Sequence, residues 1–127
     1  MVKVGEHITL DILGVKKELA PSFYEKIIYK IAKVAKVEVL NISQHNFEPQ
    51  GFTIVALLAE SHMSFHTFPE KEVISFDFFT CGKKPPSVAL DIIKKEIMHK
   101  RIVVKNFDRD NIAFYDDIYS TPGQKKF

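Results

Sequence analysis

The run AESHMSFHTF at residues 59–68 contains the side chains with the most evident chemistry in the sequence. A carboxylate, a serine and two histidines follow closely as Glu60, Ser61, His62 and His66. Serine beside histidine is a combination that nucleophilic catalysis uses, and paired histidines bind metal ions. The same run also fits a strand that carries polar residues on one half-exposed face. These three interpretations make different demands on the geometry of the run.

The spacing of the two histidines argues against a shared metal ion. His62 and His66 are four residues apart, and on a helix this spacing places two ligands on one face. Residues 62–68 alternate between two faces instead, as in a strand. Four residues of strand span about 13 Å, which is too far for two ligands of one ion. We therefore predict no metal site in this run.

The single cysteine, Cys81, is open to two interpretations when it is taken alone. A lone cysteine is most often a small, inert hydrophobic residue. Its place after a predicted strand and before Gly82 leaves the thiol accessible enough to react, although no nucleophile elbow surrounds it. The sequence also lacks the glycine-rich phosphate-binding motifs, so we do not expect a nucleotide cofactor held on such a turn.

Length and composition indicate one ordinary globular domain over residues 1–127, small enough that pairing with a second copy is expected. Hydrophobic residues make up 46% and charged residues 27%, and the net charge of +2 comes without a basic stripe that would favour nucleic acid. No apolar run approaches the roughly 20 residues of a membrane helix, and the N-terminal stretch lacks the apolar core of a signal peptide. One cysteine permits no intrachain disulfide. We therefore expect a soluble, cytoplasmic protein that binds neither nucleic acid nor membrane.

Hydrophobic periodicity predicts the elements that must position these side chains. Strands are predicted at 4–12, 37–43, 52–59, 62–68, 73–80 and 101–107, and helices at 20–36 and 85–100. The first helix is predicted from an apolar face of Phe23, Ile27, Ile31 and Ala35. These elements predict an α+β fold, a two-layer α/β sandwich whose mostly antiparallel sheet carries both helices on one face.

The stretch AESHMSFHTFPEKEVISFDFFTCG (59–82), with HNFEPQGFT (45–53) before it, resembles the prokaryotic S-adenosylmethionine decarboxylase proenzymes. The resemblance rests on ESH, then HT-aromatic-PE, then FTCG at the family's spacing. It implies a self-processing enzyme whose cofactor is a covalently bound pyruvoyl group made from Ser61. Cleavage between Glu60 and Ser61 is then expected to give a β chain, 1–60, and an α chain, 61–127, that begins with the pyruvoyl group.

The resemblance also implies roles for individual residues. The hydroxyl of Ser61 attacks the carbonyl of Glu60, and the resulting ester is eliminated to a dehydroalanine that hydrolyses to pyruvoyl and ammonia. His66 is the proton acceptor in processing, and Thr53 supplies a hydroxyl where the family more commonly has serine. The pyruvoyl group then forms a Schiff base with the substrate amine and accepts the electrons released as carbon dioxide leaves. Cys81 is the proton donor that completes decarboxylation, since an ordinary thiol is mostly protonated at neutral pH.

Substrate binding is implied at two further positions. Phe47 matches an aromatic residue that stacks on the adenine of S-adenosylmethionine, and Glu70 matches a carboxylate that accepts hydrogen bonds from the ribose hydroxyls. Without the resemblance, Phe47 would be read as core and Glu70 as a solvated turn residue. The implied product is the aminopropyl donor of spermidine and polyamine biosynthesis. Two alternatives stay open at this point, namely a pyruvoyl-dependent arginine decarboxylase of the same family and a non-enzymatic dimeric module that stays uncleaved.

The predicted hairpin of 52–59 and 62–68 has a consequence for this assignment. It places Thr53 and His66 towards one end and Ser61 at the other, with His66 about 16 Å along the strand from Ser61. That separation exceeds hydrogen-bond reach, so His66 is expected to serve the Ser61 of a second copy. We therefore predict a symmetric homodimer. Each composite site is expected to combine Ser61 and Cys81 of one chain with Thr53, His66, Phe47 and Glu70 of the other. His62 receives only a structural interpretation.

Overall fold

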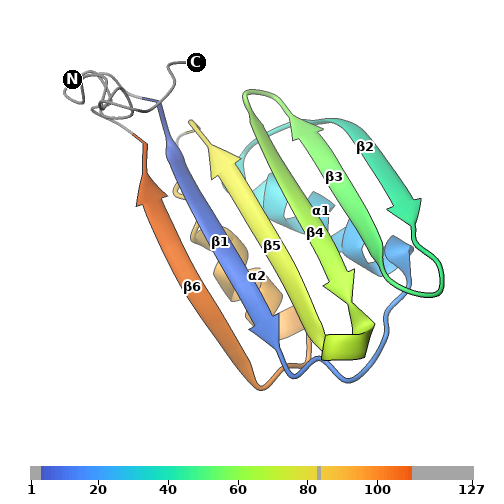
Figure 1. Cartoon of the computed structure of the whole chain (residues 1–127). Helices are drawn as coiled ribbons and strands as arrows, with labels where there is room; N and C mark the ends of the chain where they lie inside the picture. Colours follow the sequence, from blue (N-terminus) through green and yellow to red (C-terminus); the bar gives the residue numbers. More distant parts are fainter. Residues whose placement is uncertain (1–3, 83, 110–127) are drawn as a thin grey trace, which may run out of the picture.

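One six-stranded antiparallel sheet and two helices make up the fold (Figure 1). The computed structural model describes residues 4–82 and 84–109. The strands are β1 (Glu6–Leu13), β2 (Val39–Asn46), β3 (Phe52–Leu58), β4 (Ser61–Phe68), β5 (Val73–Thr80) and β6 (Arg101–Asp108), in the sheet order β2-β3-β4-β5-β1-β6. The helices α1 (Pro21–Ala35) and α2 (Val88–Glu96) lie behind the same face of the sheet, and a short 3-10 turn, η1 (Pro69–Lys71), joins β4 to β5. The predicted α+β sandwich is confirmed.

The helix-side face of the sheet carries the core because apolar residues alternate along its strands. In β1, Ile8, Leu10 and Ile12 are at most 1% exposed, while the residues between them are only partly buried. The register continues this alternation into β5, where Phe76 pairs with Leu10 and Phe78 with Ile8. The central strands therefore have one apolar face packed on the helices and one face of mixed polar and apolar residues turned away from them.

Helix α1 covers this core with one apolar side. Pro21 occupies its first turn, where a missing N–H costs nothing, and Lys36 ends it in the left-handed conformation. The buried residues of α1 are Tyr24, Ile27, Ile28, Ile31, Ala32 and Ala35. The predicted apolar face is thus correct for Ile27, Ile31 and Ala35, whereas Tyr24 is buried more completely than its neighbour Phe23.

Helix α2 is shorter than the predicted segment 85–100 at both ends. Val88 begins the helix after a turn in which Pro85 and Pro86 accept hydrogen bonds, and neither proline has an N–H to donate. At the other end, Ile97 has extended dihedral angles, φ −116° and ψ 118°. Its side chain is nevertheless 1% exposed, because the chain turns there to bring Ile97 into the core. The second strand also differs from its prediction, since β2 extends three residues past Ser43 to Asn46.

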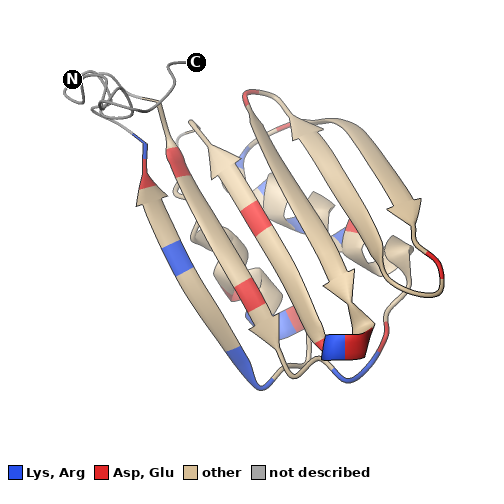
Figure 2. Ribbon diagram, viewed as in Figure 1, with Lys and Arg blue, Asp and Glu red and all other residues tan. Residues whose placement is uncertain are grey.

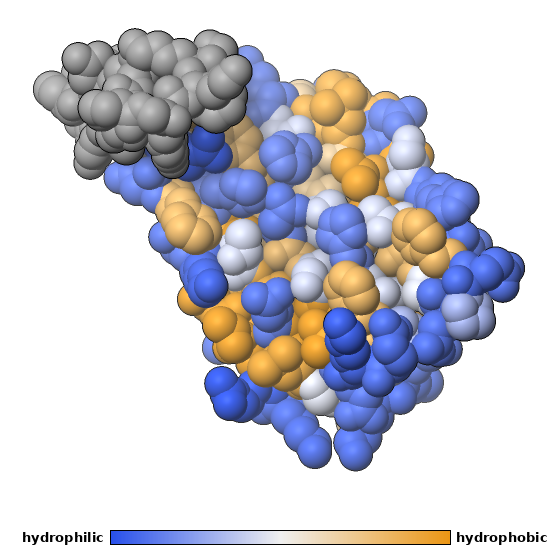
Figure 3. All heavy atoms as spheres, viewed as in Figure 1, coloured by the Kyte–Doolittle hydropathy of each residue, from blue (hydrophilic) through white to orange (hydrophobic). Residues whose placement is uncertain are grey.

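The face of the sheet opposite the helices is not covered by any described element (Figure 1). Polar and apolar side chains are intermixed on it (Figure 3), and charged residues occur within its strands β1, β5 and β6 (Figure 2). Its apolar residues include Val55, Leu57 and Phe107, which are 41%, 54% and 48% exposed. We refer to this surface as the open face. Among the described residues, no helix has the length and apolar character needed to cross a membrane.

Candidate active site

The turn between β3 and β4 carries the Glu60-Ser61 bond that the sequence singles out. Leu58 pairs with Ser61, so Ala59 and Glu60 form a two-residue hairpin loop. Glu60 is exposed and has φ +64°, the left-handed conformation that costs an ordinary residue about 1–2 kcal/mol. The favoured two-residue turns have positive φ at the first residue or at both, but here only the second has it. The N–H of Ala59 donates to the carbonyl of Glu38 at 2.8 Å and holds the loop against the residue that precedes β2.

Ser61 is the first residue of β4 and its side chain faces the helix layer. It is 7% exposed, and its hydroxyl donates to Oγ1 of Thr80 at 3.0 Å. Thr80 ends β5 directly opposite Ser61 in the register and is 3% exposed. The same Oγ1 accepts the N–H of Gly82 at 2.9 Å. Thr80 was not predicted as a site residue, although antiparallel pairing of 62–68 with 73–80 would have placed it beside Ser61.

Cys81 follows Thr80 and reaches the scissile peptide from the neighbouring strand. Its thiol donates to the carbonyl oxygen of Glu60 at 2.9 Å, and its residue is exposed. Gly5 passes close by with φ +143°, and a Cβ there would lie 2.5 Å from the carbonyl oxygen of Thr80 and 3.1 Å from Cα of Cys81. Glycine at position 5 therefore allows the chain before β1 to approach the end of β5. The structure brings Glu60, Ser61 and Cys81 together within one chain.

Thr53 and His66 form a second pair on adjacent strands. They are direct partners in the register of β3 and β4, and Oγ1 of Thr53 lies 2.9 Å from Nδ1 of His66. Both side chains are partly buried on the open face. The other ring nitrogen of His66, Nε2, lies 3.4 Å from Oγ of Ser64. A shallow hollow of about 540 Å³ on this face is lined by His66 and Ser64 among others.

Within one chain, Ser61 is separated from the Thr53–His66 pair by the direction of the side chains as well as by distance. Ser61 and His66 are five residues apart on β4, so their side chains leave the sheet on opposite faces. Ser61 contacts Thr80 on the helix side, while His66 contacts Thr53 on the open side. The sequence prediction used only the distance between Ser61 and His66 along the strand. Strand alternation also predicts that their side chains point to opposite faces. Within one chain, His66 does not reach Ser61.

Phe47 and Glu70 lie near the end of the sheet that is opposite the Glu60-Ser61 turn (Figure 1). Phe47, 50% exposed, follows β2, contacts the ring of His45 at 4.8 Å between centroids and lines an open hollow of about 410 Å³. Glu70 is exposed in η1 and does not line that hollow. The two segments are close, since a Cβ at Gly51 in the loop after Phe47 would lie 3.5 Å from Cδ of Pro69.

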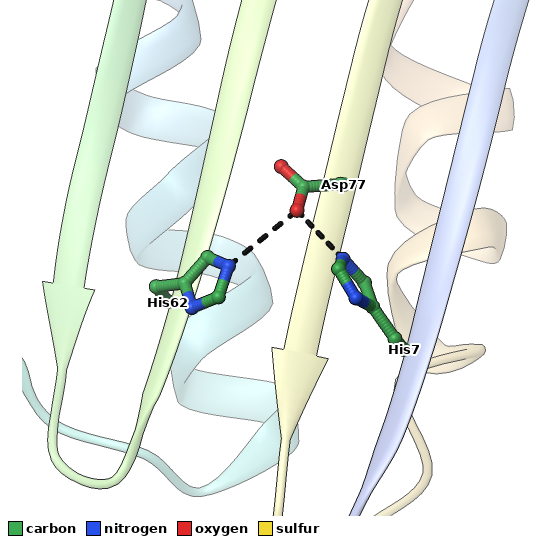
Figure 4. A group of neighbouring side chains, drawn as sticks. All are labelled: His7, His62 and Asp77. Atoms are coloured by element: carbon green, nitrogen blue, oxygen red, sulfur yellow. Dashed lines mark hydrogen bonds and ion pairs between the residues drawn. The ribbon is translucent and has the colours of Figure 1, made fainter. Parts of the chain in front are cut away.

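His62 and Asp77 belong to a cluster that also includes His7 (Figure 4). Nε2 of His7 lies 2.7 Å from Oδ2 of Asp77, and Nε2 of His62 lies 3.5 Å from the same oxygen. The ligand atoms of the three residues lie within 4.8 Å of one another. His62 and His66 thus share a face of β4 but have different partners, Asp77 and Thr53.

Comparison with known proteins agrees with this fold. A solved structure of the adenosylmethionine decarboxylase from Aquifex aeolicus is similar with a TM-score of 0.75 and 30% identity, over 87% of this chain and 93% of that one. The fold is therefore that of a two-layer α+β decarboxylase of this kind. The family model for S-adenosylmethionine decarboxylase matches residues 6–110. The chain belongs to the S-adenosylmethionine decarboxylase family.

Individual relatives support the same assignment. An S-adenosylmethionine decarboxylase proenzyme of Prochlorococcus marinus (strain MIT 9313) is 39% identical over 87% of this chain and 90% of its own length. A protein of the same name from Parasynechococcus marenigrum (strain WH8102) is 36% identical over 95% and 97% of the two chains. The chain therefore spans nearly the whole length of these relatives.

Proposed function

We propose that this chain is a proenzyme that cleaves itself between Glu60 and Ser61 and then decarboxylates S-adenosylmethionine. The product is the aminopropyl donor for spermidine and other polyamines. Membership of the S-adenosylmethionine decarboxylase family favours this substrate over arginine. Cleavage gives a β chain of residues 1–60 and an α chain of residues 61–127. The exposed thiol of Cys81 suits a reducing compartment, and we propose the cytoplasm.

The observation that carries this proposal is the constellation at the β3–β4 turn. The Ser61 hydroxyl adjoins the carbonyl of its own preceding residue, and the Cys81 thiol already donates to that carbonyl. A donor at this oxygen stabilises the negative charge that develops when Ser61 Oγ attacks the Glu60 carbonyl carbon. The amide then becomes an ester as the Ser61 nitrogen leaves with the hydroxyl proton. A base next removes the Ser61 Cα proton, the Glu60 carboxylate departs, and hydrolysis of the dehydroalanine releases ammonia.

The residues around Ser61 also fit the pyruvoyl group that this cleavage produces. Thr80 places a hydroxyl beside the Ser61 side chain, and Cys81 adds a thiol from the position directly after β5. The group supplies an electron sink for decarboxylation once it has formed. Cys81 then serves as the proton donor to the substrate carbon, since its thiol is free to turn once the peptide bond is cut. The burial of Ser61 keeps the group partly shielded from water.

His66 and Thr53 complete the site from a second copy of the chain. Their position supports this arrangement, because Thr53 and His66 lie on the uncovered face of the sheet, where a partner copy can reach them and their own Ser61 cannot. The exposed Val55, Leu57 and Phe107 give the same face apolar area to bury. Two-fold symmetry then produces two equivalent sites. In each, Thr53 offers a hydroxyl to the Glu60 carbonyl of the partner copy, and His66 is the base for its Ser61 Cα proton.

Phe47 and Glu70 are the proposed contacts for the substrate. Both are exposed and lie away from the Ser61 of their own chain, as residues contributed across a dimer should. An aromatic face can stack on adenine and attract the sulfonium cation, and a carboxylate can accept from two vicinal ribose hydroxyls. In this arrangement the same copy provides Phe47, Glu70, Thr53 and His66.

Intact-mass measurement and a decarboxylation assay test the proposal together. The purified chain should appear as two fragments, 1–60 and 61–127, and Ser61→Ala should remain a single species of 14.6 kDa. Carbon dioxide should be released from S-adenosylmethionine and not from arginine. An uncleaved wild-type chain would favour a non-enzymatic dimeric module with the same fold, and release from arginine alone would change the substrate but not the self-processing chemistry.

A further inference from the structure

A continuous chain of hydrogen bonds crosses the open face from Asp77 to Thr53. The hydroxyl of Ser64 donates to Oδ1 of Asp77, and the same Ser64 oxygen lies 3.4 Å from Nε2 of His66. Nδ1 of His66 then contacts Oγ1 of Thr53 at 2.9 Å. These hydrogen bonds join three neighbouring strands, β5, β4 and β3. Ser64 is its most buried link and is 7% exposed.

The carboxylate of Asp77 sets the direction of every bond in this chain. An ionised carboxylate only accepts, so the single hydroxyl proton of Ser64 is directed to Asp77. The Ser64 oxygen can then only accept from His66, which requires the proton of the neutral imidazole to be on Nε2. Nδ1 is left as an acceptor for the Thr53 hydroxyl. The geometry thereby selects one of the two tautomers of His66.

His7 and His62 keep Asp77 in this accepting role from its other oxygen. The 2.7 Å contact between Nε2 of His7 and Oδ2 of Asp77 is a direct hydrogen bond, and His62 approaches the same oxygen at 3.5 Å. If both residues bound one tetrahedral metal ion, Nε2 of His7 and Oδ2 of Asp77 would lie about 3.3 Å apart. Their 2.7 Å separation is that of a hydrogen bond instead. The cluster in Figure 4 is thus arranged as two imidazoles around one carboxylate oxygen.

We infer that Asp77 is a positioning residue that acts through Ser64 to hold His66 in the Nε2–H tautomer. Nδ1 is then the nitrogen that takes the Cα proton during processing, as the Thr53 hydroxyl turns to the partner's Glu60 carbonyl. The tautomer assignment stands on this chain's own contacts, whereas its effect on cleavage rests on the proposed function. Orienting groups behind a catalytic or metal-bound histidine typically contribute 10- to 100-fold or more, so Asp77 should contribute at least about 10-fold to the cleavage rate.

Replacement of Asp77 by asparagine should reverse the direction of the hydrogen bonds that link Ser64 and His66. Two imidazole nitrogens face Oδ2 and, beside a carboxylate, act as donors, while one hydroxyl faces Oδ1, so in asparagine the amide oxygen takes the histidine side and the NH₂ group faces Ser64. Ser64 must then accept from the amide and donate to Nε2 of His66, which moves the imidazole proton to Nδ1. Nitrogen-15 NMR of the histidine rings separates the two tautomers directly.

The experiment uses the full chain with Ser61→Ala, so that every molecule is unprocessed, at about pH 8, where an ordinary histidine is neutral. We expect His66 as Nε2–H in this chain and as Nδ1–H after Asp77→Asn. Asp77→Asn should leave the His66 nitrogens unchanged when Ser64→Ala is also present. Asp11→Asn is the matched control, because Asp11 is on the same face and accepts from Ser75, not from Ser64 or His66.

Cleavage of chains that retain Ser61 gives the second readout. Asp77→Asn should slow it at least about 10-fold, and Asp11→Asn should not. An Nδ1–H tautomer in the parent chain, or no tautomer change after Asp77→Asn, would overturn the inference. A changed tautomer with an unchanged cleavage rate would overturn the positioning role and leave the proposed function intact. Failure of the wild-type chain to cleave at all would instead count against the proposed function.

Discussion

The left-handed conformation of Glu60 should be measurable as a stability difference between two glycine substitutions in one turn. At φ +64°, Glu60 bears about 1–2 kcal/mol of conformational cost that glycine does not. Glycine costs about 0.5–1 kcal/mol through the greater freedom of the unfolded chain. Glu60→Gly should therefore stabilise the precursor by about 0.5 kcal/mol. Ala59→Gly, at a position without positive φ, should destabilise it by about 0.5–1 kcal/mol.

Urea unfolding of the uncleavable Ser61→Ala chain provides the assay. The two variants should differ by roughly 1–1.5 kcal/mol, which at a slope of about 1–3 kcal/mol/M separates their midpoints by about 0.3–1.5 M. Glu60 is exposed, so the loss of its side chain adds little to this difference. Equal destabilisation by both substitutions would show that Glu60 bears no such cost and would refute the strained turn at the scissile bond.

Substitutions at three further positions test other parts of the proposal. Burial, and secondarily Glu18, raises the pKa of Tyr24 from 10.0 to about 12. The neutral phenol of Tyr24 therefore contributes fully to the stability of the fold below pH 10, and this contribution is lost between pH 10 and 12. Relative to Tyr24→Phe, the free energy of unfolding should fall there by about 1.4 kcal/mol per pH unit, as urea titrations at several pH values can measure. Thr53→Ser should preserve self-cleavage, while Thr53→Val should slow it by about 10²–10³-fold in a gel assay, because only the valine removes the hydroxyl. Cys81→Ala should lower carbon dioxide release by about 10²–10⁴-fold in the chains that do cleave, and equal release would remove Cys81 as proton donor.

The local pattern of apolar residues was sufficient to predict most of the fold. The alternation in β1 and β5 and the 3.6-residue periodicity of α1 each reflect burial against one partner layer. The end of α2 was not predictable in the same way. Ile97 continues the helical apolar pattern, yet it is buried from an extended backbone, because tertiary packing outweighs periodicity at a chain reversal.

The candidate site was predicted only where neighbours in sequence or in the hairpin are also neighbours in space. The predicted hairpin places Thr53 and His66 towards one end, and in the structure they are direct partners. Thr80, Ser64 and Asp77 were missed, because their partners depend on the pairing of β4 with β5 across the η1 turn. The roles expected for Ser61 and Cys81 came from resemblance to a family, because the spacing of these residues alone does not identify the reaction in which they take part.

Co-expression of a Ser61→Ala chain with a His66→Ala chain tests the shared site most directly. Each variant alone lacks one half of both sites and should remain intact. In a mixed dimer, one site combines the intact Ser61 of the His66→Ala chain with the intact His66 of its partner. The account predicts that the His66→Ala chain is then cleaved into 1–60 and 61–127, as seen by intact mass. Mixed dimers that form but contain only uncleaved chains would contradict it.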